Sequence, residues 1–87
     1  MGIGMLRGEI KNGPFDSEVT VRFTDASNRE ISFIAPRSLV TATGDRIRVR
    51  VRIIASDGTR YLIELPGDVV GTGREVTVRG GILEPVA

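Results

Sequence analysis

The sequence predicts an all-β fold: a small six-stranded β-barrel, closed or partly open, built from hairpin repeats of about 30 residues with pseudo-threefold character. Two observations lead to this prediction. Apolar and polar residues alternate with a period of two along much of the chain, as in half-buried strands. The pentapeptide Glu-Val-Thr-Val-Arg stands at 18–22 and again at 75–79, and aligning Pro36 with Pro66 exposes a third copy of the pattern.

The alternation places the strands in order along the chain. It is strictest over 46–53, which reads Arg-Ile-Arg-Val-Arg-Val-Arg-Ile, and no segment carries a convincing helical stripe. Strands are expected at 5–11, 17–25, 29–35, 46–55, 59–65 and 75–80. One turn of helix is expected at Pro36–Val40, because proline suits the first helical position, with Pro66–Val70 as its repeat partner. Glycine-rich corners at 13–14, 44–45 and 71–73 would turn the chain between hairpins.

Side-chain parity predicts the loops of the two inner hairpins. Residues that oppose each other in an antiparallel pair point to the same face, so Phe23 should face Ile31, and Ile53 should face Tyr61. Each pairing requires an odd loop, and three residues fit best: 26–28 and 56–58. The third loop residue would adopt the left-handed conformation, which Asn28 and Gly58 tolerate. This register also sets Arg50 opposite Glu64 and Arg52 over Leu62.

Closure of the barrel requires the strand at 75–80 to pair with the strand at 5–11, which would remove the exposed sheet edges. The inward-facing residues would then fill the interior and leave little room for a ligand. This expected core consists of Leu6, Ile10, Val19, Val21, Phe23, Ile31, Phe33, Ala35, Ile47, Val49, Val51, Ile53, Tyr61, Ile63, Leu65, Val76 and Val78.

Length and composition limit the possible functions. The 87 residues are enough for a single domain, 1–87. The chain has neither cysteine nor histidine, which removes disulfides, thiolate metal sites and the commonest general base. We therefore expect a protein that is not an enzyme and that holds no cofactor or metal. The net charge is only +1, and no segment resembles a membrane span or a secretory signal, so a cytoplasmic protein without a membrane partner is expected.

Basic residues form the sharpest surface feature of the sequence. Arg46, Arg48, Arg50 and Arg52 would stand on one face of one strand, and Arg22 and Arg79 occupy similar places in the other repeats. Such a row could bind a phosphate backbone or another anion. The alternative is a solvated row in which the arginines pair with carboxylates across the hairpin and cover apolar surface with their stems.

A second feature is a set of apolar residues predicted to point outward: Ile34, Ile54 and Leu62 on strands, with Val69, Val70, Ile82 and Leu83 in loops or the tail. A contiguous patch of this kind would mark a protein interface. The alternative is a scatter of exposed apolar residues, which is normal on monomers.

These features favour a non-catalytic binding or assembly module that self-associates through the outward face with Ile34, Ile54 and Leu62. Its partner would be another copy of the chain or a different protein. The alternative is an Sm-like or OB-like small barrel that binds RNA or single-stranded DNA through the arginine row. A hydrolase that uses carboxylates alone has no supporting motif in the sequence.

Overall fold

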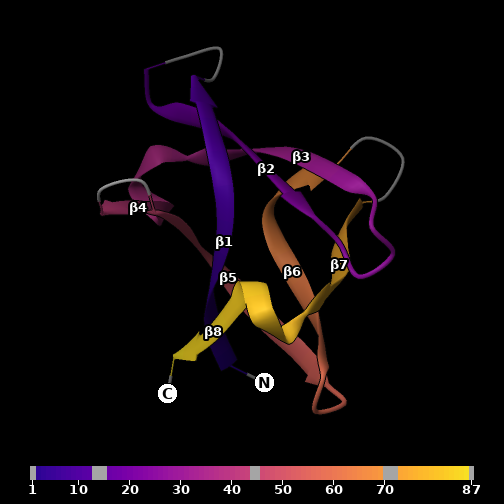
Figure 1. The fold of residues 1–87 in the computed structure, drawn as a ribbon. Helices are drawn as coiled ribbons and strands as arrows, with labels where there is room; N and C mark the ends of the chain where they lie inside the picture. The colour runs from indigo at the N-terminus through magenta and orange to yellow at the C-terminus, as the bar shows by residue number, and fades with distance from the viewer. Residues whose placement is uncertain (1, 13–15, 44–45, 70–72, 87) are drawn as a thin grey trace.

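The computed structural model describes residues 2–12, 16–43, 46–69 and 73–86. These residues form one curled antiparallel sheet, shaped as a half-barrel (Figure 1). Its strands are β1 (Gly2–Asn12), β2 (Glu18–Thr24), β3 (Glu30–Pro36), β4 (Val40–Thr43), β5 (Arg46–Ser56), β6 (Arg60–Val69), β7 (Gly73–Arg79) and β8 (Leu83–Val86). The all-β prediction is confirmed, and each of the six expected strands is present.

The sheet contains two strands and several strand pairs that the sequence did not predict. The main path of the sheet is β3-β2-β1-β5-β6-β7, with β4 added to β5 and β8 added to β1. The short strands β4 and β8 were not predicted, so the described sheet has eight strands rather than six. Pairing of the strand at 75–80 with the first strand was also wrong: in the described residues β7 pairs with β6, while β1 pairs with β2, β5 and β8.

The registers describe a twofold internal relation in place of the predicted threefold one. Leu6 lies opposite Val49 in the central β1–β5 pair. Leu6 also lies opposite Leu83 of β8, and Val49 lies opposite Val40 of β4. Residue 49 is 43 positions after residue 6, and residue 83 is 43 positions after residue 40. The same shift of 43 therefore relates the pair Leu6–Leu83 to the pair Val49–Val40. The two halves of the chain therefore repeat each other around the centre of the β1–β5 pair.

The 3₁₀ turns follow the same twofold relation. The turn η1 (Arg37–Leu39) confirms the helical turn expected at Pro36–Val40, and η2 (Gly80–Ile82) lies at the equivalent place in the second half. Pro66 stands inside β6, whereas Pro36 ends β3, so the two prolines are not structurally equivalent. The second turn expected at Pro66–Val70 is absent from residues 66–69, which belong to strand β6. Val70 and most of the expected glycine corners lie outside the described residues.

One of the two predicted hairpin loops is confirmed. In the β2–β3 hairpin the amide of Asp25 donates to the carbonyl of Arg29, which leaves a three-residue loop at 26–28. Asn28 has a φ of 63°, the left-handed conformation that the prediction placed there. The β2–β3 ladder also sets Phe23 opposite Ile31, as expected.

The β5–β6 hairpin corrects the second loop prediction. The amide of Asp57 donates to the carbonyl of Arg60, so the tip is a two-residue turn at 58–59. A bulge between Ile53 and Ala55 adds one residue to β5, and this extra residue reverses the parity on which the prediction depended. Ile53 consequently faces Ile63 rather than Tyr61, and Glu64 lies opposite Arg52 rather than Arg50.

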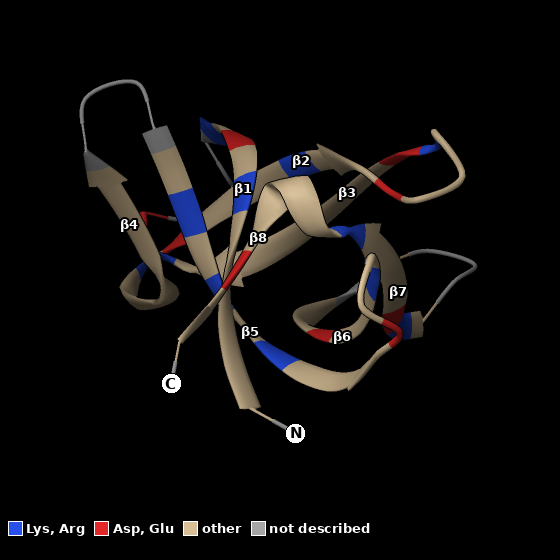
Figure 2. Cartoon of the chain, turned by 60° about the horizontal axis from the view of Figure 1, so that its bottom comes forward, with Lys and Arg blue, Asp and Glu red and all other residues tan. Residues whose placement is uncertain are grey.

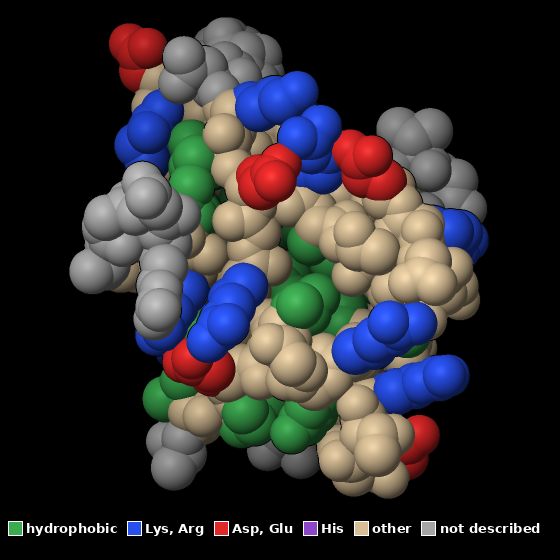
Figure 3. Space-filling model, in the orientation of Figure 1, with side chains coloured by type: hydrophobic (Ala, Val, Ile, Leu, Met, Phe, Trp, Pro, Cys, Tyr) green, Lys and Arg blue, Asp and Glu red, His purple; other side chains and the backbone are tan. Residues whose placement is uncertain are grey.

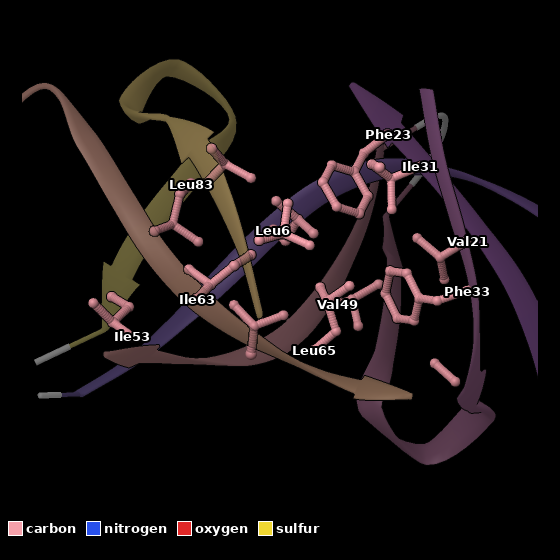
Figure 4. Close-up of a cluster of buried hydrophobic side chains, with 14 of the residues drawn as sticks. Leu6, Val21, Phe23, Ile31, Phe33, Val49, Ile53, Ile63, Leu65 and Leu83 are labelled. Atoms are coloured by element: carbon pink, nitrogen blue, oxygen red, sulfur yellow. The ribbon is translucent and has the colours of Figure 1, made fainter. Parts of the chain in front are cut away.

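The core fills the concave side of the curled sheet (Figure 4). Most of the expected inward residues are buried, and the rings of Phe23 and Phe33 meet edge to face, with centroids 6.0 Å apart. Leu83 was expected to point outward but is buried beside Leu6 in the core. Val69 and Ile82, also expected outside, pack partly against the core. These corrections follow from the curling of the sheet and from β8, which carries the C-terminal segment back onto β1.

Two contacts bring distant parts of the sheet together. The amide of Ala26, in the β2–β3 loop, donates to the carbonyl of Thr77 on β7 over 2.9 Å. On the other side, β3 lies against the end of β6, where Gly67 faces the carbonyl of Ile34 (Figure 1). Residues 34 and 77 are 43 positions apart, so the carbonyl groups in the two contacts are at equivalent positions under the twofold relation. We call them the two seams.

Candidate binding surfaces

The predicted arginine row lies on the outer face of β5, where basic positions recur along the strand (Figure 2). Arg48, Arg50 and Arg52 alternate with the core residues Val49 and Val51. Arg46 opens the strand, and its side chain lies outside the described residues. Arg7, which was not predicted to join this row, lies opposite Arg48 on β1. We call the set of Arg7, Arg48, Arg50 and Arg52 the arginine face.

Two carboxylates pair with three of the four arginines of the arginine face. Glu84 bridges two guanidinium groups, with Oε1 at 3.1 Å from Arg7 and Oε2 at 3.0 Å from Arg48. Glu64 pairs with Arg52 at 3.3 Å. Among the described residues, Arg50 is the member of this face that no ion pair engages. Of the predicted row, Arg48 and Arg52 are therefore paired with carboxylates, as the alternative expected, whereas the expected pairing of Arg50 with Glu64 is wrong and the side chain of Arg46 lies outside the described residues.

Arg22 and Arg79 flank the arginine face without joining it. Arg22 lies on β2 and is held by Glu9 and Glu30, one on each neighbouring strand. The hydrogen bond from Arg22 lowers the pKa of Glu9, and the same bond raises the pKa of Arg22. Arg79 lies on β7, and β6 separates it from β5. Its opposed residue is Arg60, a second arginine that the sequence analysis did not single out.

The outer surface of β6 and β7 has three rows of opposed residues. Arg60 faces Arg79, Leu62 faces Thr77, and Glu64 faces Glu75. The middle row continues onto β5, where Ala55 lies opposite Leu62. A shallow hollow of about 240 Å³ lies over this row and over the hairpin tip. We call the surface made by Ala55, Arg60, Leu62, Glu64, Glu75, Thr77 and Arg79 the hairpin face.

The three apolar residues predicted to form an interface do not lie in one place. Leu62 is half-buried in the middle of the hairpin face, and Ile54 occupies the bulge of β5 next to it. Ile34 is 41% exposed on β3, where its carbonyl faces Gly67. Gly67 is five residues along β6 from Leu62, or about 17 Å at the usual rise per residue. The structure thus brings Ile54 and Leu62 together and sets Ile34 apart.

Two grooves open where a central strand changes partners. The outer edge of β1 pairs with β8 at residues 3–6 and with β2 at residues 9–12, and a groove of about 480 Å³ lies over the gap at Gly8. Figure 3 shows apolar side chains in a hollow of this surface, with charged groups around it. The equivalent groove over Val51 of β5 has about 240 Å³. The first groove has two basic and two acidic residues in its lining, whereas the second has three arginines and one glutamate.

No group of three or more acidic side chains that could hold a metal ion occurs in the described part of the chain. Within the same ranges, no helix has the length and apolar character needed to cross a membrane. Comparison with protein-family models, with curated proteins and with solved structures gave no match.

Proposed function

We propose that this chain is a non-catalytic binding module that self-associates through the hairpin face. The observation that carries the proposal is the position of Leu62. It stands in the middle of a sheet face, with Ala55 and Thr77 as its directly opposed neighbours, and it is only half-buried within one copy of the chain. Covering such a residue with a second copy would remove apolar surface from water, which favours association.

The small size of the domain supports the same proposal. A chain of 87 residues has a thin core, and association is one of the ways in which small domains gain stability. Ile54 would contribute to the rim of the interface, because the β5 bulge places it beside the middle row. Ile34, at the other seam, is left out of the proposed interface.

Replacing Leu62 with aspartate should abolish self-association. The wild-type chain is expected to show a mass that rises with concentration in sedimentation velocity, up to about 200 µM, since a face of two or three strands belongs to the small class of interfaces. The L62D variant should stay monomeric over the same range, because a charge in the middle of the interface would lose its hydration.

Ile34→Asp is the matched control, since it puts the same charge on an exposed residue outside the proposed interface. Its association should equal that of the wild type. A wild-type chain that is monomeric at every concentration would rule out the proposed function.

The arginine face supports a second candidate, binding of RNA or single-stranded DNA. The supporting observation is that Arg7 of β1 adds to the row on β5, so that four guanidinium groups share one outer surface with only two paired carboxylates, Glu64 and Glu84. Arg50, exposed and without an ion pair among the described residues, would be the first contact for a phosphate.

A salt titration with labelled single-stranded RNA tests this candidate. Binding followed by fluorescence anisotropy should weaken as salt rises, with a slope of log K against log salt near about −0.7 for each neutralised phosphate. The double variant Arg48→Ala/Arg50→Ala should bind more weakly and with a shallower slope. Equal affinity of the variant and the wild type would exclude the arginine face as a nucleic-acid site.

A further inference from the structure

Like charges oppose each other at both ends of the hairpin face. Arg60 lies directly opposite Arg79, and Glu64 lies directly opposite Glu75. Directly opposed like charges destabilise an isolated sheet. Exchanging one residue between the two rows would give two opposite-charge pairs instead. Within one copy Arg52 compensates Glu64, but no ion pair in the described residues compensates Arg60, Arg79 or Glu75.

The other opposed arginine pair of the sheet is satisfied internally. Arg7 faces Arg48 across the β1–β5 pair, and the carboxylate of Glu84 bridges their guanidinium groups. For Arg60 and Arg79 the described residues contain no ion pair of this kind. The carboxylate of Asp57 lies at the same tip, and its Oδ1 accepts from the amides of Thr59 and Arg60. In the described residues this carboxylate forms no ion pair with Arg60 or Arg79. A second carboxylate from outside would complete the pair as Glu84 completes the first.

The acidic row that could supply such carboxylates is on the same face. Rows 60/79 and 64/75 stand two residues on either side of the middle row, about 7 Å along the strands in each direction. A twofold axis that crosses the strands at the middle row would reverse their direction in a second copy. It would set Leu62 against Leu62, Arg60 against Glu64 and Arg79 against Glu75. The face is therefore complementary in charge to its own copy.

We propose that the hairpin face is a self-complementary interface, in which the arginine row of one copy meets the glutamate row of the other around a twofold axis at Leu62. This inference rests on the proposed function, and it adds the relative orientation of the two copies and the charged residues that face each other across the interface. Stacked sheets lie about 10 Å apart, a distance that arginine and glutamate side chains span together. Glu64 is already paired with Arg52, whereas Glu75 is exposed on β7 at the end of the main strand path, so Glu75 provides the stronger contact.

Charge-reversed single variants test this arrangement. Arg79→Glu would place an acidic residue against Glu75 of a second R79E copy, and Glu75→Arg would place a basic residue against Arg79 of a second E75R copy. Each variant alone should lose at least about tenfold in self-association, since like charges facing each other oppose binding. An equimolar mixture should recover the association, because the acidic side chain introduced at position 79 of one variant would then face the basic side chain introduced at position 75 of the other.

The same two variants should fold at least as well as the wild type. R79E turns the opposed Arg60–Arg79 pair into an opposite-charge pair, and E75R does the same for Glu64–Glu75. Their melting temperatures, measured at low concentration, should equal or exceed that of the wild type. Loss of association would then be an effect on the interface and not on the fold.

Sedimentation velocity on the wild type, on each variant and on the mixture separates the outcomes. We expect the wild type to associate, each variant alone to lose association, and the mixture of the two variants to recover it. The charge-paired arrangement would be overturned if each variant alone associated as strongly as the wild type, or if the mixture did not recover association. Self-association of the wild type would remain in either case. A wild type that is monomeric throughout would overturn both proposals.

Discussion

Replacing Gly67 with alanine should destabilise the fold severely. A methyl group added at Gly67 would overlap the carbonyl oxygen of Ile34, and that oxygen belongs to the backbone of β3. Neither strand can move aside without opening the seam between β3 and β6. We expect a loss of about 3 kcal/mol or more in the free energy of unfolding, the upper part of the range for overpacking. For a domain of this size that corresponds to a fall in melting temperature of at least about 12 °C.

Gly81→Ala provides the matched control. Gly81 lies in η2, and a methyl group there would meet no atom within 4 Å. Thermal unfolding followed by circular dichroism should place G81A within about 0.5 kcal/mol of the wild type, as for ordinary surface substitutions. If G67A and G81A had the same melting temperature, the close approach of β3 to β6 at this seam would be wrong.

Replacing Asp25 with alanine should have the second large effect. Asp25 is 3% exposed, and one carboxylate oxygen accepts from the amides of Ser27 and Arg29, each over 2.9 Å. The other oxygen pairs with the guanidinium group of Arg29 at 3.0 Å. These bonds hold the loop that docks Ala26 on Thr77 at the other seam. Removing the carboxylate leaves two amides without their acceptor, and we expect a loss of about 3 kcal/mol.

Asp57→Ala is the control for this substitution. The carboxylate of Asp57 also accepts from two loop amides, those of Thr59 and Arg60, but it is exposed at the β5–β6 tip, where water can replace it. We expect D57A to lose about 1 kcal/mol. If urea unfolding showed the same loss in the free energy of unfolding for D25A and D57A, the role assigned to the buried carboxylate would be contradicted.

The pH dependence of stability provides a second check on Asp25. Burial raises the pKa of this carboxyl, but the hydrogen bonds from Arg29 and Ser27 outweigh burial and leave the pKa below its ordinary value. A carboxyl whose pKa is lower in the folded state stabilises the fold above the unfolded pKa of about 3.9, and this contribution is lost as the pH falls through the folded pKa. When the pH is lowered from neutral to strongly acidic, the free energy of unfolding should therefore fall less in the Asp25→Asn variant than in the wild type.

The alternation of apolar residues was sufficient to predict the fold class, the six main strands and most of the core. It also predicted the β2–β3 loop, because that ladder runs without interruption, so parity requires an odd loop and three residues fit best. The β5–β6 loop failed for the opposite reason. The bulge between Ile53 and Ala55 has no signature in the pattern, since Ile53 and Ile54 are both apolar and either one fits the inward face.

The pairing of strands could not be derived from the same pattern. The repeated Glu-Val-Thr-Val-Arg favoured a threefold arrangement, yet its two copies lie in β2 and β7, which are not equivalent under the twofold relation. That relation is carried by registers such as Leu6 with Val49, and a register becomes visible only once partners are known. The short strands β4 and β8 were missed because each has only four residues.

The candidate surfaces were predictable in part. Alternation alone placed Arg48, Arg50 and Arg52 on one outer face. Their partners Glu84 and Arg7 come from β8 and β1, whose positions depended on the missed pairing. The hairpin face escaped prediction in the same way, because its rows of like charge arise from the register between β6 and β7.

Measurement of amide chemical shifts during dilution tests the central claim, self-association through the hairpin face, most directly. On dilution from about 500 µM, a range suited to small interfaces, the amides of Arg60, Leu62, Glu75 and Arg79 should shift together along one binding curve. The amides of β2 and β3 should stay in place. Shifts confined to β3 around Ile34, or spectra that do not change with concentration, would contradict the account.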